Sequence, residues 1–102
     1  MKSRPEFSRN VQHLELVPDP DKEPKKFLLF SLKNELKAHG DTALTMTDFT
    51  DDILDIIEAS RCRTVQAVIT LDYAKKIAET QGGDIVVLFR RYIAEQNALK
   101  GV

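Results

Sequence analysis

Residues 82–100, GGDIVVLFRRYIAEQNALK, decide the fold that we expect for this chain. Wound as a helix, this stretch places its large apolar side chains on one arc, which is typical of a helix that packs against a core. These side chains belong to Ile85, Leu88, Phe89, Tyr92, Ile93 and Leu99. Asp84 suits the N-cap position, and Gly82 and Gly83 allow the chain to reverse direction without steric cost. The stretch therefore predicts a core-facing helix over residues 85–100.

The opposite side of this helix carries a second, narrower apolar stripe. It consists of Val87, Ala94 and Ala98, and Arg90 and Arg91 stand on the same side. Small apolar residues allow a second helix to approach closely, with the arginines at the rim of the contact. Single exposed apolar residues are common on any protein surface and are the alternative explanation. We expect a homodimer in which the two final helices touch, because a symmetric dimer is the commonest assembly.

The segment 64–81, which precedes the two glycines, is open to two interpretations. One continuous helix, with Thr64 as its cap, explains the segment most economically. Val65, Val68 and Ile69 are β-branched and restrict rotamers in a helix, which instead favours a strand over 63–71 followed by a helix over 72–81. We favour the single helix.

The segment 25–39 also has a helical and a strand interpretation. As a helix it would present one apolar stripe to the core, with Pro24 in the first turn and Gly40 after its end. That stripe comprises Leu28, Leu29, Leu32 and Leu36. As a strand, residues 27–32 would be buried on both faces, because apolar residues follow one another there without alternation. The poor strand formers among residues 33–37 favour the helix.

A further helix is predicted over 48–60, after Thr47, with acids in its first turn as the helix dipole favours. Its apolar face comprises Phe49, Ile53, Ile56 and Ile57. Its opposite face comprises Asp48, Asp51, Asp52, Asp55 and Glu58. A solvated polar face explains these acids. The alternative is a docking surface for a basic partner, with Asp51, Asp55 and Glu58 as its contacts.

The beginning of the chain is predicted to be less regular than the rest. Residues 1–10 form a flexible basic arm, with three basic residues against one acid, and residues 11–102 form a single globular domain. Leu14 and Leu16 alternate with polar residues, which is a weak strand signal. We expect a mainly helical domain of about four helices. The α+β alternative adds one or two short strands, near Leu14 or Val68.

The composition indicates a soluble domain without general affinity for polyanions. The 102 residues are 42% hydrophobic and 30% charged, and a net charge of −1 gives no overall attraction to nucleic acid or anionic lipid. The single cysteine, Cys62, excludes an intramolecular disulfide and suits a reducing compartment. The amino terminus lacks the apolar run of a secretory signal, and no apolar stretch approaches the roughly 20 residues of a membrane span. We expect a cytoplasmic protein.

No group of residues has the spacing of a catalytic or metal site. His13 and His39 lie far apart, and neither has a nearby cysteine or a second ligand at helical spacing. Cys62 lies between two arginines but has no histidine placed as its base. Gly82 and Gly83 lack the residues that follow in a phosphate-binding loop. We therefore expect no enzymatic activity, no cofactor, no metal and no small-molecule substrate.

Two functional hypotheses remain. The first is a small non-enzymatic regulatory or protein-interaction module that self-associates. The second is a dimeric DNA-binding transcriptional regulator, because a strand over 63–71 would give the strand–helix–helix order shared with ribbon–helix–helix proteins. Arg61, Arg63 and Gln66 would then contact DNA, although the neighbouring acidic helix would repel phosphate. We favour the first hypothesis.

Overall fold

The computed structural model describes residues 17–99, which form four α-helices and one short 3₁₀ turn, with no strand among them. In chain order the elements are α2 (Pro24–Ala38), η1 (Met46–Asp48), α3 (Asp51–Ala59), α4 (Thr64–Gln81) and α5 (Ile85–Leu99). The mainly helical single domain is confirmed, and the strand predicted near Val68 is wrong. The weak strand signal at Leu14 and the basic arm over 1–10 lie outside the described residues.

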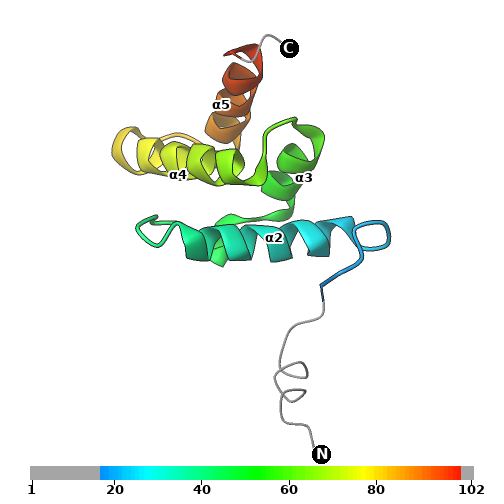
Figure 1. Ribbon diagram of the computed structural model, residues 1–102. Helices are drawn as coiled ribbons and strands as arrows, with labels where there is room; N and C mark the ends of the chain where they lie inside the picture. Colours follow the sequence, from blue (N-terminus) through cyan, green and yellow to red (C-terminus); the bar gives the residue numbers. More distant parts are fainter. Residues whose placement is uncertain (1–16, 100–102) are drawn as a thin grey trace, which may run out of the picture.

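The four described helices form a ring in which each packs chiefly against two of the others (Figure 1). α4 packs against α2 on one side and α5 on the other, whereas the shorter α3 packs against α2 and α5. α2 and α4 lie side by side, and α5 rises away from them (Figure 1). The core lies where these four helices meet.

Each helix contributes at least one fully buried side chain to a common core. The largest of these side chains belong to Phe89 of α5, Leu32 of α2, Ile53 of α3, and Leu71 and Val68 of α4. Burying an aliphatic or aromatic side chain of this size contributes about 1.5–3 kcal/mol. The apolar faces predicted from residue spacing thus meet in one place, and tertiary packing rather than helix propensity stabilises the short helices.

α5 follows the prediction except at its end. The Asp84 carboxylate accepts a hydrogen bond of 2.8 Å from the Val86 N–H and so caps the first turn. Gly82 and Gly83 adopt φ values of 82° and 112°, which L side chains rarely adopt. The prediction that Leu99 belongs to the core arc is wrong, since this residue is 80% exposed. α5 rises away from α2 and α4 toward its end (Figure 1).

α4 is one continuous helix, so the strand considered over 63–71 is wrong. Its buried residues recur at helical spacing, and they are Ala67, Val68, Thr70, Leu71 and Ala74. Burial along this stripe outweighs the strand preference of the β-branched residues, because such preferences depend on context. The cap is displaced by one residue from the prediction, since Arg63 is the N-cap and Thr64 is the first helical residue.

α2 confirms the helical interpretation of residues 25–39. Pro24 occupies the first turn, and the backbone N–H of His39 closes the last turn by donating to the Glu35 carbonyl at 3.0 Å. Leu32 is fully buried, and the other three leucines of the predicted stripe pack half-buried against the core. The strand alternative for residues 27–32 is therefore wrong.

α3 begins at Asp51, and not at residue 48 as predicted. Thr45 and Asp48 instead form a capping box around η1, in which the Thr45 N–H donates to the Asp48 carboxylate at 2.7 Å. Thr50 then caps α3 by accepting a hydrogen bond of 3.4 Å from the Ile53 N–H. Two caps follow one another in the sequence, and only the second begins an α-helix.

Candidate functional site

The structure places the predicted partner-binding residues of α5 on its outer side. Val87, Ala94 and Ala98, which we name the outer stripe, are all exposed, and Val87 is 59% exposed. Arg90 and Arg91 are exposed as well. The outer stripe is therefore exposed to solvent, as a contact surface requires.

Arg91 is held in place by its aromatic neighbour. Its guanidinium donates to the Tyr92 hydroxyl at 3.3 Å and lies 5.0 Å from the centre of the Tyr92 ring. Tyr92 in turn meets the ring of Tyr73 from α4 edge-on, with ring centres 5.0 Å apart. These contacts restrain the Arg91 side chain beside the outer stripe, which lowers the entropy that it would lose on binding.

A second exposed apolar surface, which the sequence analysis missed, lies on α4. Val65, Ile69 and Tyr73 are 40%, 47% and 53% exposed, and we name them the α4 row. Their spacing of four residues places them on one side of the helix. Together with Val87 and Leu99, the row accounts for five of the six large apolar side chains that are exposed among the described residues. The recurrence of apolar residues at every fourth position could have indicated this row from the sequence.

A cleft of about 330 Å³ lies between the α4 row and α5. It is lined by Gln66, Ile69, Thr70, Tyr73, Tyr92, Glu95 and Gln96. The cleft connects the row to the side of α5 that carries Arg91 and Glu95. The α4–α5 hairpin thus carries most of the large apolar side chains that are exposed in the described part of the chain.

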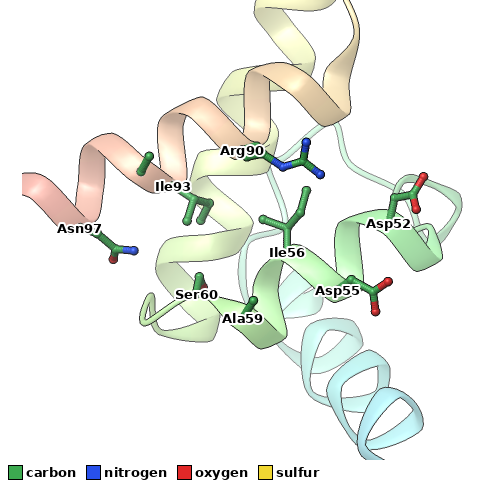
Figure 2. Close-up of a pocket in the computed structure, with 9 residues that line it drawn as sticks. Asp52, Asp55, Ile56, Ala59, Ser60, Arg90, Ile93 and Asn97 are labelled. Carbon is green, nitrogen blue, oxygen red and sulfur yellow. The ribbon is translucent and has the colours of Figure 1, made fainter.

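A different groove, of about 430 Å³, lies between α3 and α5 (Figure 2). Ile56 and Ile93 form its apolar part, with Asp52 and Asp55 on the α3 side and Arg90 on the α5 side. Its remaining lining residues are Ala59, Ser60, Ala94 and Asn97. We name it the α3–α5 groove.

The groove brings together only some of the residues predicted to bind a partner. Asp55, Arg90 and Ala94 line it, whereas Val87, Arg91, Ala98, Asp51 and Glu58 do not. No local sequence pattern indicates this groove, because it depends on how α3 packs against α5.

The acids of α3 form an exposed face, and one of them pairs with a lysine of α2. Lys25 of α2 lies 3.0 Å from the Asp55 carboxylate. The hydrogen bond to Asp55 raises the pKa of Lys25 above its ordinary value, as do the charges of Asp55, Asp51 and Glu58, while burial lowers it. Asp51, Asp52, Asp55 and Glu58 are all exposed. The α3 face therefore attracts positive charge.

The residues predicted to contact DNA do not form the expected strand. Arg61 and Arg63 are exposed in the segment between α3 and α4. Gln66 lies in the first turn of α4, where its amide donates to the Thr70 hydroxyl at 3.5 Å. The ribbon–helix–helix order on which the DNA hypothesis depended is therefore absent from the described residues.

Cys62 and His39, which we considered for catalysis and metal binding, lie near other polar side chains in the structure. Cys62 is half-buried, and its thiol donates to the Asn97 side-chain oxygen at 3.7 Å. His39 lines a small cavity with Asp72 and Lys76. Within residues 17–99, no three side chains of the His, Cys, Asp or Glu type are grouped as a metal site would need. His13 lies outside the described residues.

Asp72 of α4 makes a hydrogen bond to the segment that precedes η1. Its carboxylate accepts a hydrogen bond of 3.3 Å from the Ala43 N–H and pairs with Lys76 at 3.2 Å. Burial raises the pKa of the Asp72 carboxyl. Hydrogen bonds from Thr42, Lys76 and the Ala43 N–H outweigh that effect, so the pKa lies below its ordinary value. This cluster has a structural role, because its polar groups satisfy one another.

Comparison of the chain with protein-family models, curated proteins and solved structures finds no match. Across residues 17–99, every helix is too short or too polar to cross a membrane. The interpretation of the exposed surfaces therefore depends on their geometry and charge.

Proposed function

We propose that this protein is a small non-enzymatic interaction module that forms a homodimer through the outer side of its α4–α5 hairpin. The supporting observation is the concentration of exposed apolar side chains on these two helices. Monomeric soluble proteins rarely expose large contiguous apolar patches, and such patches mark interaction sites. The α4 row and the outer stripe together form the proposed dimer surface.

A symmetric dimer suits this surface because the same patch then serves both copies. Arg91 and Glu95 are exposed one helical turn apart on α5 and carry opposite charges. Two antiparallel copies of α5 would bring Arg91 of one chain beside Glu95 of the other, at the margin of the contact. Such a pair contributes mainly to orientation, because exposed ion pairs stabilise by about 1 kcal/mol or less.

The expected affinity follows from the side chains available. Val65, Ile69 and Tyr73 are already about half-buried, so covering the rest of each contributes roughly 1 kcal/mol. The loss of translational and rotational freedom on association offsets much of the total. We therefore propose a dimer with a Kd in the roughly micromolar range.

The test places one negative charge at different exposed positions. Ala94→Glu and Ile69→Glu introduce a charge into the outer stripe and the α4 row, and both should convert the dimer into a monomer in light scattering. Ala38→Glu makes the same change at an exposed position on α2 and should leave the dimer intact. Circular dichroism should show the same helix content for all three variants. A dimer indifferent to both hairpin variants would contradict the proposal.

We also propose that the protein acts in the cytoplasm. The support is the free, half-buried thiol of Cys62, which suits a reducing compartment. Cell fractionation that recovers the protein with the soluble cytoplasmic fraction would agree with this location, and recovery from an oxidising compartment would contradict it.

A further inference from the structure

The α3–α5 groove is a second surface, distinct from the proposed dimer surface except where Arg90 and Ala94 border both. Its volume of about 430 Å³ lies within the range of sites that bind ligands or side-chain anchors. Ile56 points from α3 toward α5, where Ile93 forms the facing apolar surface (Figure 2). Large aliphatic side chains therefore fit between the two helices.

The charged residues at the groove are unequally satisfied. Asp55 pairs with Lys25 at 3.0 Å, whereas Asp52 makes no ion pair with any other residue in the described part of the chain. Asp51 and Glu58 lie on the same exposed face of α3. Among residues 17–99, Arg90 is the only basic residue that lines the groove. The α3 side of the groove therefore retains an excess of negative charge.

The fold already contains one example of how a helix is held against α3. α2 packs on α3 with its leucines toward the core and its Lys25 ammonium on the Asp55 carboxylate. The α3–α5 groove also combines an apolar contact with a carboxylate on α3. Ile56 offers the apolar contact and Asp52 the carboxylate. A helix with apolar residues on one side and a basic residue at their edge would pack on Ile56 and pair with Asp52.

We propose that the α3–α5 groove binds an amphipathic basic helix of another protein. Aliphatic side chains of that helix pack on Ile56 and Ile93, and a lysine or arginine reaches Asp52. This is the helix-in-groove mode of recognition, in which anchors recur at positions i, i+3 or i+4, and i+7.

A second copy of this chain fits the groove less well. Its exposed helical side on α5 offers two alanines and one valine, which fill little of the space between Ile56 and Ile93. Its α4 row has larger side chains but is flanked by Asp72 and by Lys76, which pair with each other at 3.2 Å. The groove therefore favours a partner of different sequence.

The test uses two synthetic peptides of about 14 residues, or four helical turns. One has leucines on one side and lysines elsewhere, and the other has glutamates in place of the lysines. Fluorescence anisotropy of the labelled peptides with the full chain should show binding of the lysine peptide at least about tenfold tighter than of the glutamate peptide, a difference of about 1.4 kcal/mol.

Two variants locate the binding. Asp52→Lys should weaken the lysine peptide about tenfold and strengthen the glutamate peptide, whereas the matched control Asp41→Lys, at an exposed position between α2 and η1, should change neither. Ala59→Trp fills the groove without changing charge and should weaken both peptides. It also tests the site if Asp52→Lys perturbs the fold.

One variant distinguishes peptide binding from dimer formation. Ile69→Glu, which should abolish the dimer, should leave peptide binding unchanged. Lysine-peptide binding that resists both Asp52→Lys and Ala59→Trp would overturn the proposal, as would the absence of binding to the wild-type chain. Loss of peptide binding together with the dimer in Ile69→Glu would show that the peptide binds at the dimer surface and not in the groove, and would also overturn the proposal.

Discussion

Phe89 connects α5 to the rest of the molecule. It is fully buried, and it lies on α5, which packs against both α3 and α4. Its position was predictable, because it occupies the middle of the apolar arc over 85–93. The identities of its neighbours were not, since they depend on how α5 packs against α3 and α4.

Replacement of Phe89 should therefore be costly. We expect Phe89→Ala to lower the free energy of unfolding by about 3–5 kcal/mol, the usual loss for a large core aromatic side chain. Val87→Ala, two residues earlier and on the exposed side of the same helix, should change it by no more than about 0.5 kcal/mol. Urea unfolding at concentrations below dimer formation measures both. A loss below about 1 kcal/mol for Phe89→Ala would show that α5 is not part of the core.

At Asp72, the depressed pKa predicts how stability changes with pH. A carboxyl with a lowered pKa in the folded state contributes stability above its unfolded pKa, and that contribution disappears as the pH falls through the folded value. The stability difference between wild type and Asp72→Asn should therefore be largest at neutral pH and shrink below about pH 4. Urea unfolding over this pH range provides the measurement. A difference that stays constant down to pH ~2 would assign the effect of Asp72→Asn to something other than its charge.

Among the elements, the turn between α4 and α5 was predicted correctly because two glycines mark it. Gly82 has φ 82° and ψ 177°, a region that other residues adopt only with strain. The start of α3 and the single helix of α4 were harder to predict. Two capping residues, Thr45 and Thr50, precede α3, and only the second begins an α-helix. In α4 the β-branched residues favour a strand, and the helix forms because it is buried against α2 and α5.

The glycine turn allows a matched test. Gly82→Ala should destabilise the fold by about 1–3 kcal/mol, because alanine is strained at this backbone conformation. Gly40→Ala should be neutral or slightly stabilising, since Gly40 has open space where the methyl group would lie and no positive φ. Thermal unfolding compares the two variants. Equal changes in stability for the two variants would mean that the α4–α5 turn does not require the positive φ of Gly82.

At the scale of the whole molecule, only part of the candidate site was predictable. The outer stripe follows from the period of α5, and the structure leaves it exposed. The α4 row was missed because α4 is apolar on two sides, and sequence alone does not say which side faces the core. The α3–α5 groove depends on the packing of two helices and leaves no local pattern in the sequence.

The described structure also makes a prediction about nucleic acid. Without a strand over 63–71, and with the acidic face of α3 nearby, we expect no retardation of random duplex DNA at low salt. A gel-shift series with rising salt provides the measurement, because binding through phosphates weakens steeply as salt increases. Salt-dependent retardation that disappears on replacing Arg61 and Arg63 by alanine would restore the DNA-binding hypothesis.

Self-association through the α4–α5 hairpin is the central claim, and sedimentation equilibrium tests it most directly. At about 100 µM, well above a micromolar Kd, the wild-type chain should have twice its monomer mass of 11.6 kDa. Dilution should return it to the monomer, and Ala94→Glu should remain a monomer throughout. A mass of 11.6 kDa for the wild-type chain at about 100 µM would contradict the account.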